Sequence, residues 1–305
     1  MLNSLIPNFV KTVEGRLPQG TLREVKSKYL EEPRGLLNGN NSSILALPRT
    51  NKEASIIVKA CQKEKISIIP YSGGTGLVGG QVDPRHEASV ILSTERMKNI
   101  RDFYVDEKVI IVESGVILEH LQEEVSKNNL LFPLALASQG SCRIGGNLAT
   151  NAGGVQVLKY GNIRDFCLGV EAVLPNGEIF NGLNRLRKDN TGYDLKNLLI
   201  GSEGTLGLIT AASFRLFPKP NKICTAILDV KSPSEALELL NFAQEFMDER
   251  VSSFELIGRK AVEFVTKCLP EIKVPISAES EWFVLIESTS SSDKDIHAKF
   301  EQFMH

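Results

Sequence analysis

The sequence lacks the features that mark secreted, metal-stapled or membrane-spanning proteins. Its five cysteines are odd in number and widely spaced, without a C-x-x-C pair. We therefore expect reduced thiols and a cytoplasmic protein rather than a disulfide framework or a zinc site. No apolar run approaches the ~20 residues of a membrane-spanning helix. The stretch from Met1 to Gly20 has no apolar core followed by a cleavage site, which argues against a secretory signal.

An excess of charge of one sign is also lacking. The 35 lysines and arginines are balanced by 37 acidic residues, for a formal net charge of -2, so we expect no nucleic-acid partner. The four histidines are well separated in the 305-residue chain, and no metal site is expected. Hydrophobic residues at 42% and charged residues at 24% are ordinary globular values, which excludes general disorder.

Glycine is ordinary in number and uneven in position. Of the 24 glycines, five lie in Gly73–Gly80, five in Gly140–Gly154 and three in Gly201–Gly207. Glycine lets the backbone approach a ligand closely and adopt positive φ. Three such windows in one chain indicate a large ligand that is held mainly by main-chain groups.

Length predicts about two domains, since domains average roughly 150 residues. Residues 1–35 form a lead segment, in which the capping-box spacing of Thr21 and Glu24 predicts a helix that Pro33 and Gly35 end. Residues 36–218 contain all three glycine windows, and Pro218-Lys219-Pro220 is the predicted linker to residues 219–305. That last segment alternates strands and helices and ends inside a predicted helix, so we expect an incomplete α/β unit.

Periodicity and turn residues predict the elements within these segments. The clearest are a helix from Thr50 to Glu64, opened by a capping box with Glu53, and a hairpin that turns at Pro175-Asn176-Gly177. Further strands are predicted at 44–47, 66–69, 90–92, 109–112, 198–200, 206–210, 225–230, 252–256 and 282–287, and further helices at 117–128, 234–247, 259–267 and 293–304.

The first window contains a G-x-G-x-x-G pattern, Gly74 to Gly79, directly after a predicted strand. In nicotinamide-binding Rossmann folds this motif opens a helix. Here Asp83-Pro84 makes a turn and another strand follows, so a nicotinamide site is the less favoured alternative. Five glycines in eight residues exceed what a tight turn needs, and consecutive N–H groups of such a loop can cradle a phosphate.

The second window is almost uncharged, because from Pro133 to Leu158 only Arg143 carries a charge. Its small residues offer backbone donors and short polar side chains, which suit a flat aromatic ligand with a pyrophosphate; a buried loop between strands is the alternative. In the third window, main chain near Gly204 and Ile209 either packs beside a cofactor or makes a local turn in which Glu203 takes a hydrogen bond.

These residues carry a family resemblance. Pro70–Gly80 resembles the pyrophosphate loop of the FAD-linked oxidases of the vanillyl-alcohol oxidase type. The run Gly140–Gly154, together with Arg187–Asp194 and Gly201–Thr210, resembles the group of D-2-hydroxyglutarate dehydrogenase, D-lactate dehydrogenase and glycolate oxidase, most of all the first. The resemblance covers about residues 38 to 290. It implies an α+β fold with a two-subdomain FAD-binding module of the PCMH type, followed by a partial α/β cap.

The resemblance also implies FAD as the cofactor. Members with covalently bound flavin often carry histidine in the pyrophosphate loop, whereas this loop has Thr75 and no histidine, so we expect non-covalent FAD. The implied pyrophosphate contacts are Gly73, Gly74, Thr75, Gly76, Leu77 and Gly80. The other implied cofactor contacts are Ser114, Gly115, Pro133, Ser138, Gly140, Ser141, Gly145, Asn147, Thr150, Asn151, Gly153, Gly204 and Ile209.

The implied reaction is oxidation of a D-2-hydroxy acid, such as 2-hydroxyglutarate or lactate, to the 2-oxo acid, with electrons passed to an acceptor. No catalytic residue is assigned, because the family's metal-binding histidines and much of its substrate pocket come from a C-terminal segment without a counterpart here. We expect a truncated form that binds FAD and has an incomplete substrate site. The alternative is a non-catalytic FAD-binding subunit that a partner chain completes, and self-association of the cap is a further hypothesis.

Overall fold

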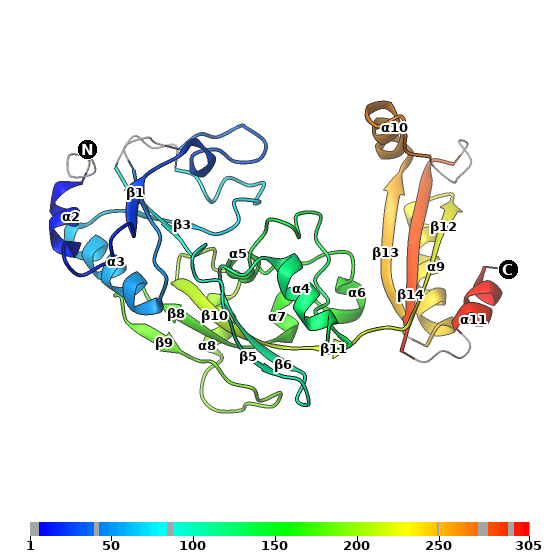
Figure 1. Ribbon diagram of the computed structural model, residues 1–305. Coiled ribbons are helices and arrows are strands. Elements are labelled where there is room, and N and C mark those ends of the chain that lie inside the picture. The colour runs from blue at the N-terminus through cyan, green and yellow to red at the C-terminus, as the bar shows by residue number, and fades with distance from the viewer. Residues whose placement is uncertain are drawn as a thin grey trace. The chain divides into compact units, whose positions relative to one another are not determined.

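The computed structural model describes residues 6–39, 43–83, 88–248, 250–273, 280–291 and 296–304. Its contacts divide the chain into two compact units (Figure 1). The first unit comprises Met1–Phe132, Ala137–Ala152 and Ile163–Leu216, and the second comprises Pro133–Leu136, Gly153–Asn162 and Phe217–His305. Both units mix helices with sheets, which confirms the predicted α+β class. Within the described ranges, each helix is too short or too polar to cross a bilayer.

The first unit begins with a four-stranded sheet in the order β1-β2-β4-β3. Its strands are β1 (Leu22–Glu24), β2 (Ile44–Ala46), β3 (Ile68–Tyr71) and β4 (Val90–Ser93). Strands β2 and β3 both run parallel to β4, and β1 is antiparallel to β2. Parallel strands are covered on both faces, and here Ile44 and Leu45 point to opposite faces and are both buried.

Helices cover both faces of this sheet. Helices α2 (Pro7–Val13) and α3 (Asn51–Glu64) pack on the face that carries Ile44, Val90 and Leu92. The 3-10 helix η1 (Ser27–Tyr29) lies on the other face, where Tyr29 meets Tyr71 edge-on with ring centroids 4.9 Å apart. The carboxyl end of β3 leads directly into the first glycine window, and Thr94 follows the carboxyl end of β4.

The second sheet of the first unit is antiparallel and has the strand order β5-β6-β10-β8-β9. Its strands are β5 (Ile100–Tyr104), β6 (Val109–Glu113), β8 (Cys167–Val173), β9 (Ile179–Asn181) and β10 (Leu208–Arg215). Helix α3 also contacts β8, and the Ser55 hydroxyl donates to the carbonyl of Gly177 in the β8–β9 turn. The two sheets of this unit therefore share α3 as a packing partner.

Short helices complete the first unit. They are α4 (Leu118–Ser126), α5 (Ile144–Ala149), α7 (Ile163–Phe166) and α8 (Leu195–Leu199), with the two-residue strand β7 (Leu130–Leu131) after α4. Phe132, Phe166 and Phe214 form an aromatic cluster beneath the second sheet, with centroids 5.1 to 6.2 Å apart. Helix α5 contacts β10, which fixes the second glycine window against the sheet.

The second unit is a three-stranded antiparallel sheet in the order β12-β14-β13. Helices α9 (Pro233–Phe246) and α11 (Ile296–Phe303) bury Ala243, Phe300 and Phe303 against it. The remaining elements of this unit are α6 (Val157–Tyr160), β11 (Phe217–Pro218), β12 (Lys222–Val230), β13 (Val251–Gly258), α10 (Arg259–Cys268) and β14 (Trp282–Ser290).

Several sequence-based predictions are confirmed. The Thr50 hydroxyl accepts from the N–H of Glu53 at 3.2 Å, and α3 runs to Glu64 as expected. The β8–β9 hairpin turns at Pro175-Asn176-Gly177. Leu118, Leu121 and Val125 are the buried residues of α4, as its periodicity predicted.

Other predictions are wrong. Residues 21–29 are not one helix, because Leu22–Glu24 pairs with Ile44–Ala46 as an edge strand and only Ser27–Tyr29 turns. Residues 198–200 are not a strand, since Asp194 caps α8 by accepting from the N–H of Asn197. Helices α2 and α5 were not predicted. The expected Asp83-Pro84 turn lies partly outside the described residues, because Pro84 is not among them.

Candidate functional site

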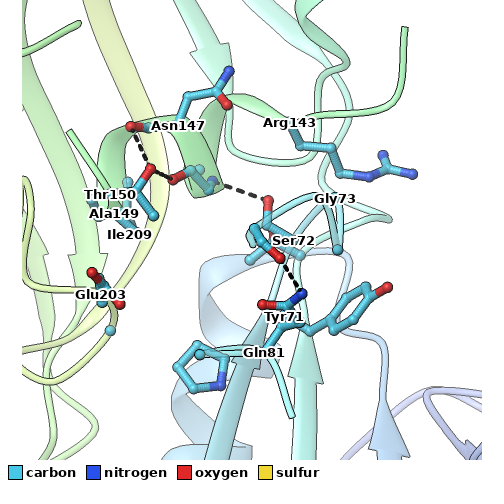
Figure 2. Close-up of a pocket in the computed structure, with 18 of the residues that line it drawn as sticks. Tyr71, Ser72, Gly73, Gln81, Arg143, Asn147, Ala149, Thr150, Glu203 and Ile209 are labelled. Atoms are coloured by element: carbon cyan, nitrogen blue, oxygen red, sulfur yellow. Dashed lines mark hydrogen bonds between the residues drawn. The ribbon is translucent and has the colours of Figure 1, made fainter. Parts of the chain in front are cut away.

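The three glycine windows line one pocket in the first unit. The loop after β3 forms one side, α5 forms the second, and the turn before β10 forms the third (Figure 2). The cavity holds about 160 Å³, which suits part of a dinucleotide rather than the whole. The residues that line the pocket are Pro70, Tyr71, Ser72, Gly73, Gly74, Thr75, Gly76, Val78, Gly80, Gln81, Thr94, Arg143, Gly145, Gly146, Asn147, Ala149, Thr150, Glu203, Gly204, Gly207, Leu208 and Ile209.

The first and second windows pack backbone against backbone. A Cβ atom at Gly73 would lie 2.7 Å from the Ser141 carbonyl oxygen and 2.8 Å from the Cys142 Cα. The Ser72 hydroxyl accepts a hydrogen bond from the N–H of Gly146 at 3.0 Å. Packing against the neighbouring chain segment therefore requires glycine at position 73.

The third window is joined to both of the others. The N–H of Gly201 donates to Leu148 at 3.0 Å, and the N–H of Glu203 donates to Ala149 at 2.9 Å. Gly204 has φ +81° and packs so closely on the Pro70 ring that a side chain would collide with it. The convergence of the windows is thus a fixed feature of the first unit.

The loop after β3 presents unpaired donors. Among the described residues, none accepts a hydrogen bond from the backbone N–H groups of Gly73, Gly74, Thr75 and Gly76. The loop keeps its shape by another contact, in which the Gln81 side-chain amide donates to the Gly76 carbonyl at 2.8 Å. Consecutive free N–H groups in a loop with a positive-φ glycine make an anion-binding concavity, and Gly74 has φ +68°.

Charged groups of both signs border this concavity. Arg143 precedes α5 and donates to the carbonyl of Gly115 at 2.6 Å, which anchors its guanidinium beside the loop. Glu203 brings a carboxylate to the opposite side and has the left-handed φ of +50°. Figure 2 places Arg143 and Glu203 on opposite sides of Ser72 and Gln81. The lining carries one cation and one carboxylate, so its formal charges cancel and binding of an anion depends on directed N–H groups.

Thr94 adds an unpaired hydroxyl. It follows β4, lines the pocket and is only 2% exposed. Its Oγ1 atom is buried without a hydrogen-bond partner, and such a group costs roughly 1–3 kcal/mol when nothing satisfies it. A polar ligand atom in the pocket would remove this cost. The free loop N–H groups and this hydroxyl therefore fit a polar ligand with an anionic part, such as a pyrophosphate.

The structure brings together ten of the predicted contact residues. They are Gly73, Gly74, Thr75, Gly76, Gly80, Gly145, Asn147, Thr150, Gly204 and Ile209. Their contact with a cofactor stays a prediction, since the pocket itself shows only that they share one cavity lining.

Seven other predicted residues of the first unit lie outside the pocket lining. Leu77 is exposed, and a Cβ atom at Gly140 would lie 3.2 Å from a carboxylate oxygen of Glu119. Ser114 and Ser141 pack behind the lining, against Gly145 and Gly73 respectively. Gly115 accepts the Arg143 bond, Ser138 accepts from the N–H of Ser141, and Asn151 accepts from the N–H of Arg164.

The two remaining predicted residues, Pro133 and Gly153, belong to the second unit. A Cβ atom at Gly153 would lie 2.9 Å from Cγ2 of Val157, within that unit. Across the described ranges, no group of three or more histidine, cysteine or acidic side chains is placed to hold a metal ion.

Sequence reasoning missed Ser72, Thr94 and Gln81. Each is a single polar residue without a spacing pattern. Ser72 and Thr94 reach the pocket only because segments distant in sequence meet there, whereas Gln81 bonds to Gly76 within its own loop. Arg143 had a detectable signal as the one charged residue of its window, yet only the fold shows that it lines the pocket.

Comparison with known families agrees with the geometry. Residues 42–182 match the family model described as FAD binding domain. The match confirms FAD as the predicted cofactor.

Similar proteins of known name indicate which group of FAD-linked enzymes the chain resembles. The chain is 37% identical over 264 residues to D-2-hydroxyglutarate dehydrogenase, mitochondrial, of Arabidopsis thaliana, a match that covers 87% of this chain and 47% of the relative. For the Bos taurus protein of the same name the identity is 41% over 251 residues, with 82% and 45% covered. These matches confirm the predicted resemblance to the D-2-hydroxyglutarate dehydrogenase group of FAD-linked oxidases. The chain spans about half the length of the curated relatives it matches.

Solved structures agree on the fold. Alkyldihydroxyacetonephosphate synthase superposes with a TM-score of 0.76 over 98% of this chain and 60% of its own, at 20% identity. Sequence identity at this level supports a shared fold and nothing further.

The prediction of a cytoplasmic protein is wrong. The names of the Arabidopsis, Bos taurus and Rattus norvegicus relatives all include "mitochondrial", which contradicts it. Scarce, unpaired cysteines indicate a reducing compartment and do not tell one such compartment from another.

Proposed function

We propose that this chain is the FAD-binding part of a dehydrogenase that oxidises a D-2-hydroxy acid, such as 2-hydroxyglutarate or lactate, to the 2-oxo acid. The observation that carries the proposal is the meeting of three glycine windows at a pocket with four free loop N–H groups. The names of the relatives supply the substrate class. A Saccharomyces cerevisiae relative, 34% identical over 263 residues, is named D-2-hydroxyglutarate--pyruvate transhydrogenase, which fits the same substrate.

In this proposal the loop from Gly73 to Gly76 holds the pyrophosphate through its N–H groups, as backbone nests hold anions elsewhere. The buried Thr94 hydroxyl gives a further polar contact, and Arg143, which is held by the Gly115 carbonyl, brings a positive charge to the pocket lining. Bound FAD supplies the hydride acceptor for the oxidation. The chain contributes binding and orientation, and no described residue is assigned as the base.

The flavin is proposed to be non-covalent, since Thr75 in the loop offers no imidazole for attachment. The test is acid precipitation followed by denaturing gel fluorescence. Flavin in the supernatant and a dark protein band are expected. A band that fluoresces after denaturation would contradict non-covalent binding.

Activity is tested by reduction of dichlorophenolindophenol with D-2-hydroxyglutarate or D-lactate, with the L-enantiomers as controls. If the chain acts alone, the D-substrates reduce the dye in the presence of FAD. If it is a subunit that a partner completes, dye reduction appears only after a second chain is added. A nicotinamide enzyme would show neither the yellow flavin bands nor FAD-dependent dye reduction, and that result would overturn the proposal.

A further inference from the structure

A second pocket in the first unit is strongly cationic. It holds about 300 Å³ and shares no lining residue with the glycine-window pocket. Arg164, Arg187, Lys196 and Arg215 line it, against one carboxylate, Asp165. Four cationic side chains around a small cavity repel one another, and an anion between them lowers that repulsion.

Arg164 is held in place for such a role. Its guanidinium donates to the carbonyl of Asn197 at 2.6 Å and to that of Ile200 at 2.6 Å. Both carbonyls belong to the end of α8, so the bonds fix the planar group at the pocket wall. A guanidinium that is already oriented loses less side-chain entropy when it binds an oxyanion.

The acidic groups near this pocket neutralise only part of the positive charge of its four cationic side chains. Lys196 lies 3.6 Å from the Asp194 carboxylate, which offsets one cation. Arg187 has no ion pair among the described residues. The lining therefore keeps a positive excess that faces the cavity.

Asn197 provides a second, independent sign of a ligand. It lines the cavity, and its Oδ1 atom is buried without a hydrogen-bond partner. Its side-chain nitrogen donates to the Asp194 carboxylate at 2.7 Å, which leaves the oxygen as a free acceptor. A buried acceptor among cations calls for a ligand that carries an O–H donor as well as negative charge.

We propose that this cationic pocket binds a compact oxyanion with two or more negative charges and a hydroxyl group. Arg164, Arg187, Lys196 and Arg215 receive the charge, and Asn197 Oδ1 accepts from the hydroxyl. Phosphoryl and polycarboxylate compounds share this chemistry, since the guanidinium fork matches both.

The test is calorimetric titration of the 305-residue chain with citrate and with pyrophosphate, at constant ionic strength and with saturating FAD, so that the glycine-window pocket is filled. Arg187→Gln and Lys196→Gln should each weaken binding about tenfold, the size expected for loss of one charge-assisted hydrogen bond. Arg185→Gln is the matched control, because Arg185 pairs with Glu107 outside the cavity.

Tricarballylate, which is citrate without its hydroxyl, isolates the role of Asn197. We expect it to bind about tenfold more weakly than citrate, because Asn197 Oδ1 stays unpaired. The proposal is overturned if neither anion binds to a chain that circular dichroism shows to be folded, or if Arg187→Gln and Lys196→Gln bind as well as Arg185→Gln. Equal affinity for citrate and tricarballylate would remove Asn197 from the site.

Discussion

The Ser72 hydroxyl accepts a hydrogen bond from the backbone N–H of Gly146 at 3.0 Å, and it thereby ties the loop after β3 to α5. The two residues are 74 positions apart in sequence, and the bond joins two glycine windows at the pocket wall. Their close approach explains why position 146 is glycine, since a Cβ there would lie 3.0 Å from the Ser72 Cβ.

Ser72→Ala should loosen this junction. The change leaves the Gly146 N–H without its acceptor, at a cost of about 1 kcal/mol, and we expect FAD affinity to fall about fivefold. Flavin fluorescence titration measures the effect. Ser27→Ala, at an exposed position of η1, is the control, and equal FAD affinity of the two variants would contradict a role for Ser72.

Two glycines of the same loop should respond differently to alanine. Gly73→Ala forces a Cβ against the Ser141 and Cys142 backbone, so we expect a loss of roughly 1–3 kcal/mol in unfolding free energy. Gly76→Ala meets only the flexible end of the Gln81 side chain, at 3.2 Å, so its stability should stay near that of the parent chain.

The two alanine variants distinguish the effect of a glycine on protein stability from its effect on FAD binding. Urea denaturation should single out Gly73→Ala, whereas FAD titration should show that Gly76→Ala folds normally and binds FAD less tightly, because its methyl group crowds the phosphate cradle. Unimpaired FAD binding by Gly76→Ala and by the bulkier Gly76→Val would place the pyrophosphate elsewhere.

Thr94→Val should weaken FAD binding and stabilise the FAD-free chain. Valine keeps the shape and removes a buried hydroxyl that has no partner in the protein, so the FAD-free chain should gain about 1 kcal/mol in unfolding free energy. FAD affinity should fall about fivefold, since the hydroxyl no longer meets the ligand. Thermal unfolding with and without FAD measures both effects, and a loss of stability in the FAD-free variant would show that Thr94 has a structural partner instead.

A buried ion network should govern stability in acid. Burial alone would raise the pKa of Glu171, yet hydrogen bonds from Arg101 and Thr210 hold that pKa below its ordinary value. A lowered folded-state pKa adds stability above the unfolded value of about 4.3, and this stability is lost as pH falls through the folded pKa.

Removal of Arg101 should therefore cost most near neutral pH. Arg101→Gln should lose roughly 3 kcal/mol at pH 7, and the difference from the parent chain should shrink below about pH 4, as Glu171 becomes protonated in both proteins. Urea denaturation across this range is the measurement. Lys127→Gln breaks an exposed pair with Glu124 and should change stability little at any pH, because solvent screens such pairs. A pH-independent loss for Arg101→Gln would exclude Glu171 as the cause.

Local sequence signals predicted the elements whose stability is local. The Thr50 cap and the Pro175-Asn176-Gly177 turn each fix their structure within a few residues. The Thr21 and Glu24 spacing failed, because pairing of Leu22–Glu24 with β2 decides the backbone there. Capping residues favour a helix locally, and hydrogen bonding to a neighbouring strand can override that preference.

The glycine windows predicted which segments meet at the pocket, but not the packing that also requires some of these glycines. A Cβ at Gly73 or at Gly145 would collide with a neighbouring segment, at Ser141 and at Ser114 respectively. Helix α5 escaped prediction because Gly145 and Gly146 disfavour helix, whereas burial of Ile144 and Leu148 stabilises it. Close packing of segments far apart in sequence leaves no trace in local periodicity.

The most direct measurement is calorimetric titration of the folded 305-residue chain, stripped of flavin, with FAD. We predict saturable binding of one FAD per chain, release of unmodified flavin on denaturation, and loss of binding in Gly76→Val with the fold retained. Absence of FAD binding by the folded chain, or full binding by Gly76→Val, would contradict assignment of the glycine-window pocket as the flavin site.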